Sequence, residues 1–372
     1  MKKIITIIAI LVSLVMLSTV VVNAEENSFL YDLSGIYNSL SDEVRESLNN
    51  IGATSADPNT LSEITFSSII SEILNLAGEN ASSPLRGMIS ITALLLMSSI
   101  LSAYKSSLNS DISTALNITT ALCITCAVAV PAISVINSTA NVIAISSNLM
   151  IAYIPIMVVI MATSGHAVSG ASYYSMMLAA GEGVGQLSTK VIVPLLNMFL
   201  GLSITSNVSP DINLSGFMNM FSKSIKWILG FGMTIFTAVL ALKQLITSSL
   251  DDVSTRAVRF TLNSFIPIVG SALSDAYKTV LGSVGLLKSG IGVFVILSVA
   301  VVFLPVILQS IMWILTLWLG KSTAEVLGLA QPAKLLDSIN TVFSTMLAIL
   351  LCIMSIYIIS TAIVLIAGKG TG

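Results

Sequence analysis

Long apolar runs dominate the chain, and short polar segments separate them. A helix that crosses the hydrocarbon of a membrane needs about 20 predominantly apolar residues. Runs of this kind predict seven membrane-spanning helices, at 85–104, 114–136, 141–163, 172–204, 226–247, 290–319 and 340–367. The fourth and sixth runs are too long for one plain span, so each is expected to be a broken helix or two short ones. The predicted fold class is an all-α, polytopic membrane helix bundle.

Prolines interrupt several of the predicted spans, at Pro131, Pro155, Pro194 and Pro305. Each proline removes an internal hydrogen bond and is expected to kink its helix. Lipid cannot satisfy the freed carbonyl, so another helix or a trapped water must do so. Serine, threonine and asparagine recur throughout the spans, and this favours a tightly packed bundle without establishing a pore.

The first 24 residues have the pattern of a secretory signal peptide. Lys2 and Lys3 precede an apolar stretch at 4–22, and small residues stand at the −3 and −1 positions of a cleavage site after Ala24. Because the apolar stretch is longer than usual, an uncleaved anchor stays open as an alternative. In both cases the segment that follows is expected outside the cytoplasm.

Residues 25–84 are predicted to form a short extracytoplasmic helical segment. Apolar residues recur at helical spacing in its first half, and Asp57-Pro58 interrupts the pattern. A second helix is predicted from Thr60 to Ala77. The segment is expected to be a pair of surface helices packed on the membrane domain or a docking platform for an external partner.

The composition supports a membrane protein with an acidic external part. Only 9% of the 372 residues are charged, against about 25% in a typical soluble domain. Residues 25–79 hold ten acidic residues and one basic residue, whereas 80–372 hold eight acidic and thirteen basic residues. The chain has no dense basic patch, so nucleic-acid binding is not expected. Three cysteines give no disulfide framework.

Glu182 is the most unusual side chain of the predicted spans, because it lies in an apolar stretch between Gly181 and Gly185. A carboxylate at membrane depth costs on the order of several kcal/mol unless it is paired or hydrated. One interpretation is a broken helix that lines an aqueous path. The alternative is a helix interruption near the interface, with Glu182 in headgroup water or paired with Lys190.

Enzyme motifs are missing. Cys123 and Cys126 lie on one helix face without a second pair of ligands, so they are predicted to be small core residues. The single histidine, His166, cannot supply a histidine-rich metal site, and the chain has no Walker A sequence. We therefore expect no catalytic residue, no cofactor and no metal, and the chain is not expected to be an enzyme.

The segment 250–289 lies between two long apolar runs but carries seven charges. A proline and a glycine predict a break in its middle, and the apolar stripe from Leu273 to Leu287 then predicts an amphipathic helix. The segment is expected to lie on the inner leaflet as a pair of interfacial helices, or to form a re-entrant hairpin or a coupling surface for a cytoplasmic subunit. Its functional candidates are Arg256, Arg259, Pro267, Gly270, Asp275 and Lys278.

The same segment resembles the stage III sporulation protein AE family. The likeness rests on Asp251, Val253, Arg256, Arg259, FIPIVG at 265–270, SDA at 274–276, TVLG at 279–282 and Leu287-Lys288. It extends to IPIMVVIMATSG at 154–165 and covers most of the chain. The external segment 25–84 matches in character alone.

The resemblance implies a role in endospore formation. Proteins of the family are polytopic components of a complex that is made in the mother cell. That complex joins a forespore-side partner across the intermembrane space and looks like a specialised secretion or feeding channel. The expected location is the mother-cell membrane around the forespore, with the N-terminal segment in the intermembrane space.

The composition implies contact with the lipid bilayer. The resemblance implies further partners, namely other membrane subunits of the channel complex and a cytoplasmic secretion-type ATPase. Two other classes stay open. One is an ion- or proton-coupled transporter that uses Glu182, and the other is a passive assembly scaffold.

Overall fold

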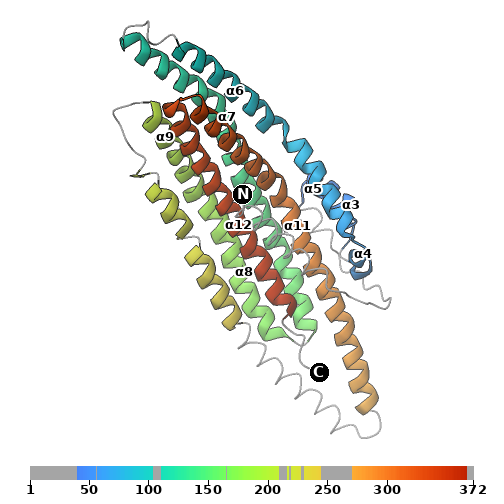
Figure 1. Cartoon of the computed structure of the whole chain (residues 1–372). Coiled ribbons are helices and arrows are strands. Elements are labelled where there is room, and N and C mark those ends of the chain that lie inside the picture. Colours follow the sequence, from blue (N-terminus) through green and yellow to red (C-terminus); the bar gives the residue numbers. More distant parts are fainter. Residues whose placement is uncertain are drawn as a thin grey trace.

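The computed structural model describes residues 40–55, 57–103, 110–164, 166–208, 216–217, 219–227, 230–243 and 270–366. Within these ranges every regular element is a helix, so the predicted all-α fold class is confirmed. Figure 1 shows an elongated bundle. Its labelled helices are α3 (Asp42–Asn50), α4 (Pro58–Ser62), α5 (Phe66–Asn80), α6 (Ser82–Ala103), α7 (Ser110–Thr163), α8 (Ala167–Leu187), α9 (Val193–Val208), α11 (Gly270–Val326) and α12 (Ala330–Ile366). The π-helix η2 (Ser188–Ile192) joins α8 to α9.

Among the described residues, five helices are long and apolar enough to cross a membrane. They are Ser82–Ser102, Ile118–Thr163, Asn219–Lys243, Lys288–Val326 and Ala330–Ala362, and a shorter apolar helix runs over Lys190–Thr205. The 46-residue span in α7 is about 70 Å long, because an α-helix rises about 1.5 Å per residue. It therefore exceeds the hydrocarbon core of a membrane, which is about 30 Å thick.

The predicted runs 114–136 and 141–163 are one helix, so their separation into two spans was wrong. The polar connection at 137–140 contains neither glycine nor proline. The Thr139 hydroxyl donates a hydrogen bond to the Val135 carbonyl oxygen at 2.8 Å and is thereby satisfied inside the helix. A short polar stretch without a helix breaker thus continues the helix, and α7 also passes through Pro131 and Pro155.

The sixth run is not broken either. α11 runs without interruption from Gly270 to Val326 and includes Pro305. The amphipathic stretch predicted after Gly270 is therefore continuous with the following span, and it is not a separate interfacial helix. The fourth run is interrupted as expected, but by the π-helical turn η2 and not by a loop.

Close helix contacts hold the core together at glycines. A Cβ atom at Gly87 of α6 would lie 2.3 Å from Cη2 of Trp313 on α11. Trp313 is fully buried and stacks on Phe343 of α12, with ring centroids 5.7 Å apart. The Thr316 hydroxyl donates to the Pro84 carbonyl oxygen at 3.3 Å. These contacts fix the start of α6 against the α11–α12 pair.

The N-terminal helices α3, α4 and α5 pack along α11 (Figure 1). Leu48, Ile51 and Leu61 are buried and belong to the main hydrophobic core. The second helix predicted from Thr60 is instead divided in two. The Asn59 N–H donates to the Asp57 carboxylate at 3.0 Å and caps α4, and Thr65 caps α5.

Candidate functional site

The structure describes some of the predicted site residues but not all of them. Ala24, Arg256, Arg259 and Pro267 lie outside the described residues. Gly270 was expected to lie in a break between two helices. It is instead the first residue of the helix α11. Asp275 and Lys278 follow in the same helix, and Glu182 belongs to α8.

The helix around Glu182 is intact. α8 continues through the Gly181–Gly185 stretch, and the irregular turn comes afterwards, at η2. Pro194 has no N–H to donate, so the carbonyl oxygen of Lys190, four residues earlier, has no α-helical partner, and Lys190 lies within the π-helical turn. The Lys190 ammonium donates to Gln186 Oε1 at 3.1 Å, so its described partner is an amide oxygen. Such π-helical turns often mark functional positions in helices.

Cys123 and Cys126 are both exposed on α7, so their prediction as core residues was wrong. The exposed face of the helix passes through both positions. Within the described residues, no group of three or more histidine, cysteine, aspartate or glutamate side chains could hold a metal ion.

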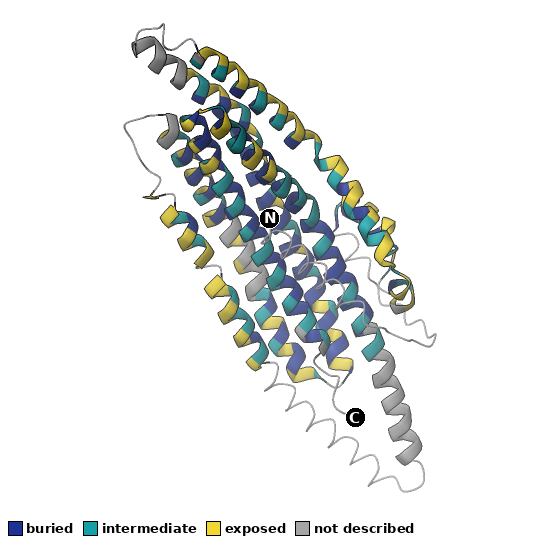
Figure 2. Ribbon diagram, in the orientation of Figure 1, coloured by how far each residue is buried: buried dark blue, intermediate teal, exposed yellow. Residues whose placement is uncertain are grey.

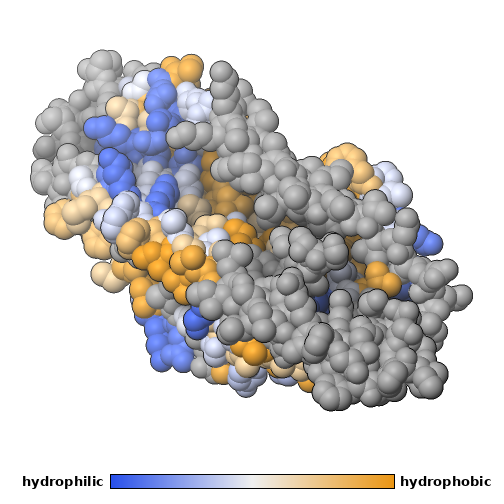
Figure 3. All heavy atoms as spheres, turned by 90° about the horizontal axis from the view of Figure 1, so that it is seen from below, coloured by the Kyte–Doolittle hydropathy of each residue, from blue (hydrophilic) through white to orange (hydrophobic). Residues whose placement is uncertain are grey.

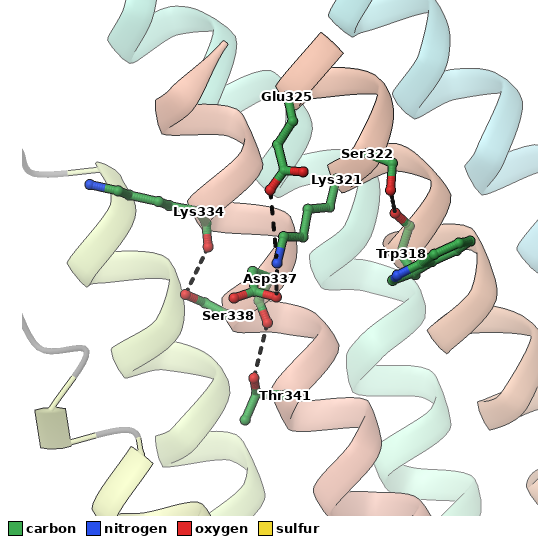
Figure 4. Close-up of polar contacts among 8 residues, drawn as sticks. All are labelled: Trp318, Lys321, Ser322, Glu325, Lys334, Asp337, Ser338 and Thr341. Carbon is green, nitrogen blue, oxygen red and sulfur yellow. Dashed lines mark hydrogen bonds and ion pairs between the residues drawn. The ribbon is translucent and has the colours of Figure 1, made fainter. Parts of the chain in front are cut away.

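A cluster of charged side chains lies near the turn that joins α11 to α12 (Figure 4). The Lys321 ammonium lies 2.8 Å from Asp337 Oδ1 on α12 and 3.9 Å from Glu325 Oε1 on its own helix. Trp318 and Lys334 are exposed beside this pair. Tryptophan and lysine side chains typically anchor helices at the boundary between membrane and water. The cluster therefore marks one end of the apolar bundle.

A tight turn sets the register of this cluster. Gly328 has a φ of +72°, a conformation that favours glycine. Its N–H donates to the Glu325 carbonyl oxygen at 3.1 Å, and the Leu329 N–H donates to the Ala324 carbonyl oxygen at 2.8 Å. These two bonds form a Schellman motif. Sequence reasoning missed the ion pair, because the pairing follows only once the turn is placed at Gly328.

We call the exposed surface of α3–α5 the acidic edge. Its carboxylates are exposed to solvent, at Asp42, Glu43, Glu46, Asp57, Glu63 and Glu79. Arg45, the single basic residue among them, lies 3.2 Å from Asp42. A seventh carboxylate, Glu72, is buried and accepts a hydrogen bond from Asn50 Nδ2 at 3.0 Å.

We call the span Asn219–Lys243 the apolar edge, because its large side chains are exposed almost throughout. They are Met220, Trp227, Phe231, Ile235, Val239 and Leu242. The Trp227 and Phe231 rings stack on each other at 5.2 Å, and the Ser222 and Thr345 hydroxyls, 2.8 Å apart, join the span to α12. Charged residues occur toward its ends, at Lys223, Lys226 and Lys243.

The two edges lie on opposite sides of the bundle. Figure 1 shows α3–α5 along one side and the segment 219–243 along the other, and both surfaces are largely exposed in Figure 2. Seen from below, hydrophilic and hydrophobic atoms of the described residues gather in separate patches (Figure 3). The described surface is thus divided into regions that need different surroundings.

An all-α bundle with several apolar helices of membrane-spanning length defines a multipass membrane protein. The family model for stage III sporulation protein AE matches residues 58–368. Because this match covers most of the chain, the protein belongs to the stage III sporulation protein AE family, and its role lies in sporulation.

One relative is the stage III sporulation protein AE of Bacillus subtilis (strain 168). The two are 26% identical over 239 residues, which make up 63% of this chain and 59% of the relative. This chain thus spans about three-fifths of that protein's length. No solved structure matches.

Proposed function

We propose that this protein is a membrane component of a sporulation-specific secretion or feeding channel complex that links mother cell and forespore and is required for late forespore development. The observation that carries the proposal is the family match over residues 58–368. The role is structural and not enzymatic. In this proposal the protein lies in the mother-cell membrane around the forespore, with its N-terminal segment 25–84, which follows the signal peptide and includes the acidic edge, in the intermembrane space.

The division of the surface supports an assembled state. Charged side chains within a membrane are costly unless they face water or a protein partner. The acidic edge therefore suits contact with other subunits or with an aqueous space, while the apolar edge suits lipid. The proposed partners are other membrane subunits of the channel complex and a cytoplasmic secretion-type ATPase.

A transporter would be favoured by an internal repeat with matching broken spans in both halves. The described second half offers no counterpart to η2, because α11 and α12 are continuous helices. The channel-complex proposal is therefore preferred over a transporter that uses Glu182.

The proposal is tested by deleting the gene in its own spore-forming host. We expect engulfment to proceed, expression of a late forespore reporter to fail and the spore titre to fall by orders of magnitude. A second copy of the gene should restore all three. A normal titre of heat-resistant spores in the deletion strain would contradict the proposal.

The coupling to other subunits is tested by charge reversal in the basic part of the segment 250–289. The double change Arg256→Glu with Arg259→Glu should block sporulation after engulfment while the protein still accumulates in the membrane. Charge reversal adds repulsion to the lost attraction, so it probes a contact more sharply than truncation does. Normal spore yield at a normal protein level would show that these arginines serve as headgroup anchors.

A further inference from the structure

One face of α7 stays exposed along the whole apolar part of the helix. The exposed residues along the midline of this face are Thr119, Cys126, Val130, Asn137, Asn141 and Asn148. The spacing between successive residues alternates between seven and four. This 11-residue repeat corresponds to three helical turns, so all six positions lie on one line. We call this line the α7 stripe. It has no charged residue, because none occurs between Ile118 and Thr163.

The asparagines of the stripe lie at the middle of the apolar bundle. The span Ile118–Thr163 is 46 residues long, and its midpoint falls at Ala140 and Asn141. If the span is centred in the membrane, about 20 residues around this midpoint lie in hydrocarbon. Asn137, Asn141 and Asn148 then all lie at membrane depth.

These three amides are exposed and, within the part of the chain that the structure describes, have no hydrogen-bond partner. Asn197 on α9 offers a contrast, because its Nδ2 donates to the Val193 carbonyl oxygen at 3.0 Å and is satisfied within its own helix. Lipid offers an amide neither a donor nor an acceptor, and an unmade hydrogen bond in hydrocarbon is unfavourable. The α7 stripe therefore needs a polar neighbour.

We propose that the α7 stripe is the contact through which two copies of this chain associate in the membrane. An amide carries both donors and an acceptor, so identical amides pair with each other across a two-fold axis. Copies that insert in the same orientation have parallel α7 helices, and this brings Asn137 and Asn141 opposite their equivalents. A single polar asparagine fixes the register of paired helices in the same way.

The composition of the stripe fits self-association better than other neighbours. A charged face would repel its own copy, but the α7 stripe is uncharged. Small side chains at Cys126 and Ser134, both exposed, allow two helix backbones to approach closely. The inference rests on the geometry of α7 and is independent of the proposed channel role.

The association is tested by cysteine cross-linking in native membranes. Cys123, Cys126 and Cys352 are replaced by serine, and single cysteines are introduced by Ser134→Cys or Val130→Cys, which leave all three asparagines in place. A mild oxidant should convert both variants to a disulfide-linked species of twice the monomer mass. The matched control is Ser175→Cys, an exposed serine on α8, which should stay monomeric.

The role of the amides is tested in the Ser134→Cys background. The double change Asn137→Leu with Asn141→Leu should lower the yield of cross-linked dimer about tenfold, since it removes the interhelical hydrogen bonds. Asn197→Leu, which removes an asparagine satisfied within its own helix, should leave the yield unchanged.

Three results would overturn the proposal. A Ser134→Cys variant that reacts with a water-soluble maleimide and does not cross-link would place the stripe against water. A variant that neither reacts nor cross-links would place it against lipid. A cross-linked product of another mass would identify a different subunit as the neighbour.

Discussion

The acidic edge and the apolar edge flank the same part of the helix bundle, yet they need opposite surroundings. The acidic edge leads into α6 where Pro84 meets Thr316, and the apolar edge starts where Ser222 meets Thr345. Thr316 and Thr345 lie 12 and 17 residues from Gly328 at the end of the α11–α12 pair, so the two contacts are at a similar height. A flat membrane around a single copy would put lipid against both edges.

Exposed carboxylates are suited to water or to a protein partner, whereas exposed aromatic side chains are suited to lipid, so one solvent cannot suit both edges. The comparison shows that the bundle is not a uniform cylinder in lipid, because one side of it requires water or protein. Burial of Leu48 and Ile51 in the main core also shows that the acidic helices are part of the bundle.

The largest expected effect comes from placing a charge on the apolar edge. Ile235→Lys puts an ammonium in the middle of the span Asn219–Lys243, where a lysine costs about 3 kcal/mol in a membrane helix. The amount of protein in the membrane fraction, measured by immunoblot, should fall at least about tenfold. Ser71→Lys, at an exposed position of the acidic edge, is the matched control and should accumulate normally. Equal tolerance of both changes would remove the distinction between the edges.

Chemical labelling should separate the two edges in growing cells that have a single membrane. In a background without the native cysteines, Ser55→Cys, between α3 and α4, should react with an impermeant maleimide in intact cells. Val239→Cys on the apolar edge should not react, although this residue is exposed in the isolated chain. Labelling of Ser55→Cys only after lysis would show that the predicted extracytoplasmic position is wrong.

The junction between the acidic edge and α6 should be sensitive to a single methyl group. Gly87→Ala places a Cβ 2.3 Å from the buried Trp313 ring, and overpacking of this kind costs about 1–3 kcal/mol. The melting temperature of the detergent-solubilised protein should therefore fall by several degrees. Gly78→Ala is the control, because no atom lies within 4 Å of its added Cβ and alanine favours the helix. A lower melting temperature for Gly78→Ala than for Gly87→Ala would contradict the packing described here.

The helical fold was predictable from the sequence, because runs of apolar residues longer than a membrane crossing leave few other structures. The lengths of the helices could not be predicted in the same way. The polar residues 137–140 have the composition of a connection, but the helix continues through them, and the Thr139 hydroxyl is satisfied by the Val135 carbonyl oxygen of the same helix. Whether a polar stretch ends a helix depends on neighbours that composition does not contain.

The candidate sites were less predictable than the fold. Glu182 was singled out by its charge in an apolar run, yet the irregular turn lies after it, at Ser188–Ile192. The acidic edge was evident from composition, but its packing on α11 requires long-range contacts. The Lys321–Asp337 pair depends on the register of a turn and could be inferred only after Gly328 was placed.

The smallest expected effect tests how far the end of the α11–α12 pair lies from hydrocarbon. Lys321 and Asp337 are both partly exposed, and ion pairs in water contribute about 0–1 kcal/mol. Lys321→Met, Asp337→Leu and the double variant form a mutant cycle, whose coupling energy is obtained from unfolding measurements in detergent and in lipid nanodiscs. We expect a coupling below about 1 kcal/mol in both, because both side chains are partly exposed. A coupling that rises above about 2 kcal/mol in lipid alone would place the ion pair inside the membrane, because breaking a desolvated pair leaves an uncompensated charge. The membrane would then extend past the turn at Gly328, and the centre of the membrane would lie farther from the acidic edge.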